Sequence, residues 1–234
     1  MKNSLVKHTK HVHGCSKKLV IFDLDGTLYR LRGGSFKHSM VYKEVLKKTT
    51  RYIMEKLNKT YQEAESILEE ILKEYGESIS VALEEKFKLN RYDYFNFVWD
   101  IPAKRYIKKN IKLKKMLMKI KNDFDLALIS DAPRVWINRV LKELGIENIF
   151  KDKIFSGEGN TRKEFNNAFE KVIKILNIKP ECCIVFGDQE KTDIIPAKKL
   201  GMKTVLVSRE KKPTEADYSI RNILEIERLL NLLK

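Results

Sequence analysis

Cysteine is scarce in this sequence: three of the 234 residues are cysteines, and two of them, Cys182 and Cys183, are adjacent. Three cysteines in this arrangement do not make the paired framework that stabilises small secreted domains. Neighbouring residues of a strand point to opposite faces, so we expect Cys182 and Cys183 to be small buried apolar side chains. The sequence therefore predicts a protein of the reducing cytoplasm.

Long apolar runs are also missing. The longest ones, such as residues 126–129, are far shorter than the roughly 20 residues that span a bilayer. The basic residues at the start are not followed by a long apolar segment, so we expect neither a signal peptide nor a membrane partner. With 43% hydrophobic and 34% charged residues, the chain has the composition of a globular protein that can bury a full core.

Acidic residues are outnumbered, with 32 against 47 lysines and arginines, and the basic excess is concentrated in two segments. Residues 1–18 hold five lysines and no acid, and residues 101–122 hold nine lysines and arginines and no acid. Two interpretations remain open: solvated surfaces, or a positive field that attracts an anionic substrate. No recognised nucleic-acid-binding module accompanies the lysines, which argues against a nucleic-acid partner, and the sequence is compatible with an oligomer.

Helical and strand patterns alternate from about residue 110 onward. Short buried strands are expected at residues 19–22, 126–129, 153–155, 184–186 and 204–207. Helices are expected at residues 111–121, 134–144, 163–176, 192–200 and 222–233. This alternation predicts an α/β fold, a doubly wound parallel sheet whose strands are joined by right-handed crossovers.

Residues 40–100 show only helical patterns. Thr60 and Glu63 form a capping-box sequence that opens one helix, and Gly76 is its expected end. We therefore divide the chain into a basic N-terminal extension at 1–16, an α/β catalytic core at 17–31 and 105–234, and a helical insertion at 32–104. No standard zinc spacing relates the potential ligands of the extension, which are His8, His11, His13 and Cys15.

Polar residues of a particular kind stand where the strands of this sheet are expected to end. They are Asp23 and Asp25 after the first strand, Ser130 and Asp131 after the second, Asp188 after a later one, and Lys163 at the start of a helix. The carboxyl ends of parallel strands meet at one crevice, where such sheets bind ligands. Carboxylates gathered there repel one another unless a cation lies between them, and oxygen ligands with an open position favour Mg²⁺.

Two carboxylates two residues apart suit phosphoryl transfer. Ionised Asp23 can attack phosphorus and form an aspartyl-phosphate, which divides one difficult step into two easier ones. Protonated Asp25 can donate its proton to the leaving oxygen and afterwards activate water. A cation and Lys163 would neutralise the charge on the phosphoryl oxygens, and the Ser130 hydroxyl with backbone N–H groups would orient them.

Four segments that carry these residues resemble, in order, the four motifs of the haloacid dehalogenase superfamily. The segments are FDLDGTLY at 22–29, ALISDAPR at 127–134, RKEFNNAF at 162–169 and GDQEKTD at 187–193. The resemblance covers residues 17–230 and implies Asp23 as nucleophile and Asp25 as acid and base. In the third segment, Glu164 replaces a frequent proline, and Arg162 is an alternative to Lys163 as the catalytic cation.

The resemblance also implies which residues bind the ligands of the site. Mg²⁺ is expected on the side chains of Asp23 and Asp188 and the backbone carbonyl of Asp25, with Asp193 as an outer or second acidic ligand. The residues expected to bind the substrate phosphate are Thr27, Ser130, Asp131 and Lys163.

The same superfamily has a subclass with a mobile helical cap after the first motif, where residues 32–104 stand. Gly33-Gly34 is then either the hinge of the cap or a surface turn. Residues 93–110 and 215–230 are similar to segments of nucleotidase-like and phosphoglycolate phosphatase-like members.

The expected function is thus Mg²⁺-dependent hydrolysis of a small phosphomonoester, such as a nucleoside monophosphate or a phosphoglycolate-like compound. The alternatives on this fold are a phosphomutase, a dehalogenase and a non-catalytic binding protein. A dehalogenase typically lacks an acid at the position of Asp25, and a non-catalytic relative often lacks the nucleophile. Both acids are present here.

Overall fold

A computed structural model of the chain describes residues 15, 17–33, 35–159, 162–163, 167–210 and 213–233. Within them, six parallel strands form one sheet in the order β3-β2-β1-β4-β5-β6, which confirms the predicted fold class. The strands are β1 (Leu19–Phe22), β2 (Asp125–Ser130), β3 (Ile154–Ser156), β4 (Cys183–Gly187), β5 (Lys203–Val207) and β6 (Tyr218–Ile220). The sequence did not predict β6 because two of its 3 residues are exposed, so this strand has no apolar run.

Strand β1 lies inside the sheet and pairs with β2 on one side and with β4 on the other. Val20 and Phe22 pack into the core on one face of the sheet, and Leu19 and Ile21 into the core on the other. Burial on both faces explains why the sequence of β1 is continuously apolar. The chain runs from β1 outward through β2 to β3 and then returns to β4 across β1, so the switch point lies at the carboxyl end of β1.

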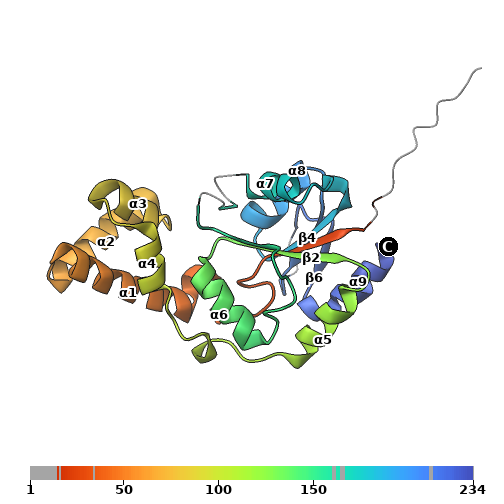
Figure 1. Cartoon of the computed structure of the whole chain (residues 1–234), viewed down its shortest axis with the longest axis horizontal. Helices are drawn as coiled ribbons and strands as arrows, with labels where there is room; N and C mark the ends of the chain where they lie inside the picture. The colour runs from red at the N-terminus through yellow and green to blue at the C-terminus, as the bar shows by residue number, and fades with distance from the viewer. Residues whose placement is uncertain are drawn as a thin grey trace, which may run out of the picture.

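Helices cover both faces of the sheet (Figure 1). Helices α5, α6 and α9 pack on the face of Val20 and Phe22, and α7 and α8 on the opposite face. Their bounds are α5 (Ile111–Ile120), α6 (Arg134–Leu144), α7 (Ala168–Ile175), α8 (Ile195–Lys199) and α9 (Ile226–Leu232). A π-helical turn, Glu190–Ile194, leads from β4 into α8.

Helix α7 begins later than predicted, at Ala168 instead of residue 163. Asn167 adopts a left-handed conformation with φ of 47°, which interrupts a helix in this direction. Lys163 lies in a turn, where its backbone N–H donates a hydrogen bond of 2.7 Å to Oδ1 of Asp131. Residues 164–166, with Glu164, lie outside the described residues.

Between β1 and α5 the chain forms helices that lie beside the sheet (Figure 1). They are α1 (Met40–Leu57), α2 (Tyr61–Tyr75), α3 (Ile79–Phe87) and α4 (Arg91–Val98). The hydroxyl of Ser39 caps α1 by accepting a hydrogen bond of 3.1 Å from the N–H of Tyr42. The capping box of Thr60 and Glu63 is present as predicted, and α2 ends at Gly76.

The segment that leads from β1 into α1 contains a tight turn. Gly33 has φ of +110°, and a Cβ atom at this position would lie 2.3 Å from the backbone oxygen of His38. Glycine is therefore required at residue 33 by the turn itself. Gly34, the second residue of the predicted hinge, lies outside the described residues.

The cysteines differ from the prediction. Cys182 is buried as predicted, but it is not a free small side chain of the core, because it forms a disulfide with Cys15 with Cα atoms 5.7 Å apart. The two residues precede β1 and β4, and these neighbouring parallel strands begin at the same edge of the sheet. Cys183 is a buried free thiol as expected, and burial raises its pKa to about 12. The remaining extension, with His8, His11 and His13, lies outside the described residues.

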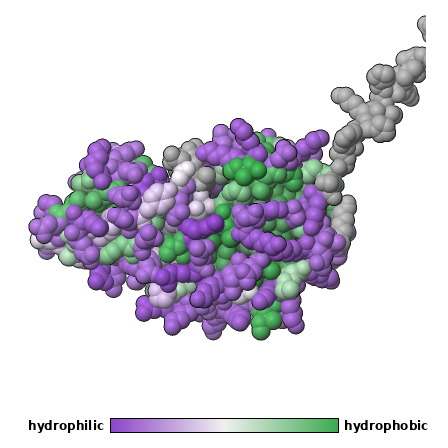
Figure 2. Space-filling view, in the orientation of Figure 1, coloured by the Kyte–Doolittle hydropathy of each residue, from purple (hydrophilic) through white to green (hydrophobic). Residues whose placement is uncertain are grey.

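The face of the molecule shown in Figure 2 is mostly hydrophilic. The lysines of α5 point to solvent, since residues 112, 114, 115 and 119 are all exposed. This part of the basic segment therefore lies on a solvated helix face. Among the described residues, none of the helices is both long enough and apolar enough to cross a membrane.

Candidate active site

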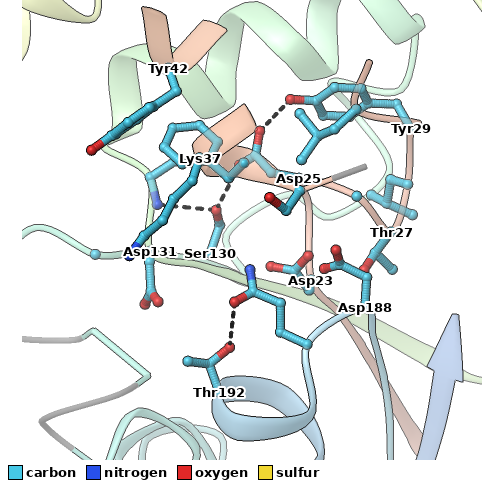
Figure 3. A pocket seen from close by; sticks show the side chains of 18 of the residues that line it. Asp23, Asp25, Thr27, Tyr29, Lys37, Tyr42, Ser130, Asp131, Asp188 and Thr192 are labelled. Atoms are coloured by element: carbon cyan, nitrogen blue, oxygen red, sulfur yellow. Dashed lines mark hydrogen bonds between the residues drawn. The ribbon is translucent and has the colours of Figure 1, made fainter. Parts of the chain in front are cut away.

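A cavity of about 920 Å³ lies at the carboxyl ends of β1, β2 and β4. Side chains that follow these strands line it on the core side, and residues of α1, α3 and α4 line it on the side of the helical insertion. Figure 3 shows Asp23, Asp25 and Asp188 gathered together, with Ser130 beside Asp25 and Tyr42 of α1 farther away. The ends of separate strands therefore converge on one cavity, as the predicted topology requires.

Three carboxylates form the centre of the site. Asp23 follows β1, Asp188 follows β4, and Asp193 lies in the π-helical turn; their carboxylate oxygens lie within 4.8 Å of one another. The backbone permits this only with glycine at residue 26, which has φ of +100°. A Cβ atom there would lie 2.2 Å from Oδ2 of Asp188. Gly26 therefore allows the turn after Asp23 to approach the end of β4.

Lys163 supplies a buried positive charge to this cluster. Its Nζ lies 2.7 Å from Oδ1 of Asp23 and also donates to Oδ1 of Asp193, and its side chain is only 3% exposed. Burial opposes the charged ammonium, but the carboxylates of Asp193, Asp23 and Asp131 outweigh it and hold the pKa of Lys163 well above its usual value. Lys163 is therefore a permanent cation beside Asp23.

The acidic cluster has more negative charge than Lys163 neutralises. Burial, together with the charges of Asp23 and Asp193, raises the pKa of Asp188 to about 8. Burial also raises the pKa of Asp193 to about 6, although Lys163 opposes this shift. Oδ2 of Asp23 and Oδ1 of Asp188 are buried and have no hydrogen-bond partner among the described residues. Buried carboxylate oxygens without partners are the donor set that a hard divalent cation such as Mg²⁺ prefers.

Without a divalent cation, we expect the fold to lose stability between pH 5.5 and pH 8. The folded pKa of Asp188, about 8, exceeds its unfolded value, so its protonated form stabilises the fold at low pH and this contribution is lost as pH rises towards 8. In EDTA, the thermal midpoint of the original enzyme should fall by about 4 °C more between pH 5.5 and pH 8 than the midpoint of Asp188→Asn. This difference corresponds to roughly 1–2 kcal/mol in the free energy of unfolding. Parallel pH profiles for the two proteins would contradict this prediction.

The carboxyl group of Asp25 is held by hydrogen bonds on both oxygens. Nε1 of Trp136 donates to Oδ1 at 2.9 Å, the hydroxyl of Tyr29 donates to the same oxygen, and Oγ of Ser130 lies 3.5 Å from Oδ2. Burial raises the pKa of Asp25 to about 6, although the hydrogen bonds from Trp136 and Tyr29 oppose the shift. A carboxyl with this pKa can both donate and accept a proton near neutral pH.

Two buried hydroxyl groups complete the core side of the cavity. Oγ of Ser130 accepts a hydrogen bond of 3.2 Å from the backbone N–H of Ala132, and its own proton is directed to Oδ2 of Asp25 at 3.5 Å, a long contact that a ligand can replace. Oγ1 of Thr27 is buried without a hydrogen-bond partner among the described residues. Both residues line the cavity, so their hydroxyls are available to an anionic ligand.

The structure brings the predicted site residues together and shows which contacts hold them. Asp193 does not line the cavity: it lies behind it, where it holds Lys163 and accepts a hydrogen bond of 3.0 Å from the N–H of Gln189. The Asp131 side chain holds the turn of Lys163. Arg162, the alternative cation, donates instead to Oγ of Ser78 in the insertion at 2.8 Å.

Tyr29 and Trp136, which donate hydrogen bonds to Asp25, were not among the residues predicted from the sequence. Tyr29 stands within the first motif segment, four residues after Asp25, so its position was the available signal. Trp136 had none, because a lone tryptophan on the apolar face of a helix is typical of a core residue. It is indeed completely buried, and only its ring N–H reaches the site.

Known proteins are similar to this chain in sequence and in fold. The profile of the haloacid dehalogenase-like hydrolases matches residues 17–201. The chain is 30% identical over 235 residues to glyceraldehyde 3-phosphate phosphatase of Methanocaldococcus jannaschii, covering 93% of this chain and 97% of the relative. It is 27% identical over 225 residues to the protein of the same name from Methanothermobacter thermautotrophicus, covering 89% and 93%. The crystal structure of a HAD phosphatase from Thermococcus onnurineus superposes with a TM-score of 0.62 at 22% identity, covering 91% and 97%, and shows the shared fold.

The fold and the site together are those of an α/β protein with a parallel sheet, whose inner strands β1 and β4 are followed by carboxylates at one cavity. The chain belongs to the haloacid dehalogenase-like hydrolase family, which confirms the resemblance of its four motif segments. Family membership and the phosphatase relatives together identify an enzyme of the phosphoric monoester hydrolase type.

Proposed function

We propose that this enzyme is a Mg²⁺-dependent phosphatase that hydrolyses a small phosphomonoester through an aspartyl-phosphate on Asp23. One observation carries the proposal. One carboxylate oxygen of Asp23 lies 2.7 Å from Nζ of Lys163, while the other is buried beside the cavity without a hydrogen-bond partner among the described residues. A carboxylate in this setting is charge-compensated and retains an oxygen that can bond to phosphorus.

In the first step, the Asp23 carboxylate forms a bond to phosphorus and the bond to the leaving alkoxide breaks. Asp25 transfers its proton to the leaving oxygen, and its raised pKa supports a protonated population near neutral pH. Lys163 offsets charge on the phosphoryl oxygens, and the hydroxyls of Ser130 and Thr27 donate hydrogen bonds to them.

In the second step, a water molecule attacks the phosphorus of the aspartyl-phosphate. Asp25 is now ionised and accepts a proton from this water, so the bond between phosphorus and Asp23 breaks and inorganic phosphate leaves. Both aspartates return to their starting protonation states. Asp25 thus serves as acid in one step and as base in the next, which a carboxyl with a pKa of about 6 can do.

The residues of the cluster fit Mg²⁺. The side chains of Asp23 and Asp188 and the backbone carbonyl of Asp25 would hold the ion, with Asp193 behind them. The fit rests on the buried Oδ1 of Asp188, which has no hydrogen-bond partner among the described residues, and on the raised pKa of this residue. Both indicate that its ionised carboxylate lacks sufficient positive charge nearby. When bound, Mg²⁺ would offset the negative charge of the carboxylates and of the phosphoryl oxygens.

We assign residues 32–104 as a cap over a core of 17–31 and 105–234. Three observations support this division: the insertion lines one side of the cavity, Arg162 bonds to Ser78, and Arg139 of α6 forms an ion pair with Asp100 at the end of the insertion. A cap in this place can exclude water and select the organic part of the substrate. Its inner side carries both aromatic and basic groups, such as Tyr42, Tyr94 and Arg91.

We propose a three-carbon phosphate ester of the glyceraldehyde 3-phosphate type as substrate, since two relatives aligned over most of their length bear that name. With Mg²⁺, kcat/KM for glyceraldehyde 3-phosphate should exceed kcat/KM for phosphoglycolate. It should exceed kcat/KM for a nucleoside 5′-monophosphate by at least about tenfold. Release of inorganic phosphate is the readout, which separates hydrolysis from transfer back to a sugar. A preference for the nucleotide would contradict the substrate, and no release from any ester would contradict the phosphatase.

A further inference from the structure

The carboxyl group of Asp25 is clamped from two directions by residues outside the predicted site. Tyr29 comes from the turn after β1, and Trp136 comes from the first turns of α6 (Figure 3 shows Tyr29 and Asp25). Both donate to the same oxygen, Oδ1. The ring of Trp136 is completely buried, so its N–H direction is fixed by packing.

Two donors on Oδ1 decide which oxygen of Asp25 carries the acidic proton. An oxygen that accepts two hydrogen bonds has no lone pair left for a proton, so the proton of the neutral acid resides on Oδ2. Oδ2 lies on the side of Ser130, 3.5 Å from its Oγ, where the substrate phosphate is expected. The clamp therefore holds the proton of Asp25 on the side of Ser130, a residue that lines the cavity with Asp25.

An aromatic column connects this clamp to the helical insertion. The ring centroid of Trp136 lies 6.3 Å from that of Trp99, and the ring of Trp99 stacks on Phe36 with centroids 5.9 Å apart and planes inclined by 7°. Phe36 precedes α1, and Trp99 directly follows α4. The column thus joins both ends of the insertion to the ring that holds Asp25.

We propose that Tyr29 and Trp136 are positioning residues that orient the Asp25 carboxyl for proton transfer, and that the Phe36–Trp99–Trp136 column makes this orientation depend on the placement of α1–α4. The proposal rests on the proposed function in one respect, the role of Asp25 as the acid. The simpler alternative is a structural one, because a buried tryptophan N–H usually finds some acceptor. The two interpretations differ in which substrates have a lower kcat/KM when the hydrogen bonds from Tyr29 and Trp136 are removed.

The test compares leaving groups in the full-length enzyme with Mg²⁺. An alkyl phosphate needs a proton on its leaving oxygen, whereas 2,4-dinitrophenyl phosphate releases a stable phenolate without one. The kcat/KM value reports the steps up to leaving-group departure, so the later attack of water does not contribute. In Tyr29→Phe and Trp136→Phe we expect kcat/KM for the alkyl ester to fall about tenfold or more, and that for the dinitrophenyl ester to change less than about twofold.

Two further variants test the column and the specificity of the effect. Trp99→Leu removes the stack without changing a residue that contacts Asp25. It should also lower kcat/KM for the alkyl ester more than for the dinitrophenyl ester, but by a smaller factor than Tyr29→Phe or Trp136→Phe. Tyr75→Phe removes a hydroxyl that donates to Glu85 at 3.1 Å, outside the cavity, and should leave both esters unaffected. Because Trp136→Phe leaves a gap in the core, Tyr29→Phe, which removes only one hydroxyl, keeps the test valid if the tryptophan variant fails to fold.

The outcome with Asp25→Asn separates this inference from the proposed function. If Asp25→Asn loses far more on the alkyl ester than on the dinitrophenyl ester, but Tyr29→Phe and Trp136→Phe lose equally on both or on neither, the positioning role is overturned. If Trp99→Leu alone shows no selectivity, the dependence on α1–α4 is overturned while the clamp stands. If Asp25→Asn itself shows no selectivity, the acid assigned under the proposed function is wrong, and the clamp falls with it.

Discussion

Replacing Asp23 by asparagine should lower kcat by at least about three decades, the scale seen when one member of a catalytic unit is removed. Asparagine has nearly the same shape, so the cavity should persist. Its amide is a poor nucleophile, however, and leaves no carboxylate to carry the phosphoryl group. Because the variant also loses a negative charge next to the phosphate site, KM should stay the same or fall. Steady-state release of inorganic phosphate with the best ester measures both constants.

The matched control is Asp125→Asn. Asp125 begins β2, so it stands at the opposite end of the strands, where it pairs with Lys153 at 2.8 Å. This variant should keep the activity of the original enzyme. A second measurement uses the original enzyme. When it is quenched with acid during turnover, peptide mass spectrometry should find a phosphoryl group on the peptide that contains Asp23. An Asp23→Asn enzyme that retains more than about a tenth of its activity would exclude the aspartyl-phosphate mechanism.

Burial explains how much of the fold was predictable. Five strands have apolar sequences because helices or neighbouring structure cover them, and each was expected close to its observed bounds. Strand β6 has two exposed residues out of 3 and therefore no apolar run. The start of α7 was misplaced for another reason. The periodic apolar pattern continues through residue 165, but the turn at Lys163 is held by Asp131, a residue 32 positions away.

The same distinction applies to the site. Asp23 and Asp188 were predictable because a polar residue directly after a buried strand has its position fixed by the sheet. Trp136 was not predictable, since one ring nitrogen makes its hydrogen bond to Asp25, while its position in the sequence indicates only that the ring is buried. The disulfide of Cys15 and Cys182 joins residues 167 positions apart, and only the pairing of β1 with β4 brings them together.

These features make charge balance the central constraint on the site. Asp23, Asp188 and Asp193 are concentrated within a few ångströms, and Lys163 is the cation that contacts two of them among the described residues. One lysine cannot neutralise three carboxylates. Under the proposed function Mg²⁺ would supply the remaining positive charge, and binding of the substrate phosphate would depend on both cations. Stability and activity of this enzyme should therefore respond together when either cation is removed.

Replacing Lys163 by methionine should show this coupling. Methionine keeps the length and most of the volume of the side chain but removes the charge, so kcat/KM should fall by about 10²–10³, the loss typical for one charge-stabilising group. In EDTA the free energy of unfolding of the variant should also be lower by roughly 3–5 kcal/mol, because the buried carboxylates lose their positively charged partner. Added Mg²⁺ should raise its thermal midpoint more than that of the original enzyme, since the ion then offsets the charge that Lys163 carried.

Thermal unfolding with and without Mg²⁺, together with kinetics on the best ester, measures the three effects in one preparation. Lys153→Met is the matched control, because Lys153 also pairs with an aspartate, but at the partly exposed amino end of β2, where such pairs contribute about 0–1 kcal/mol. That variant should differ little from the original enzyme in activity and in its response to Mg²⁺. If Lys163→Met is as active as the original enzyme, or is more stable in EDTA, Lys163 does not balance the charge of Asp23 and Asp193, and the catalytic cation must be sought elsewhere in the cavity.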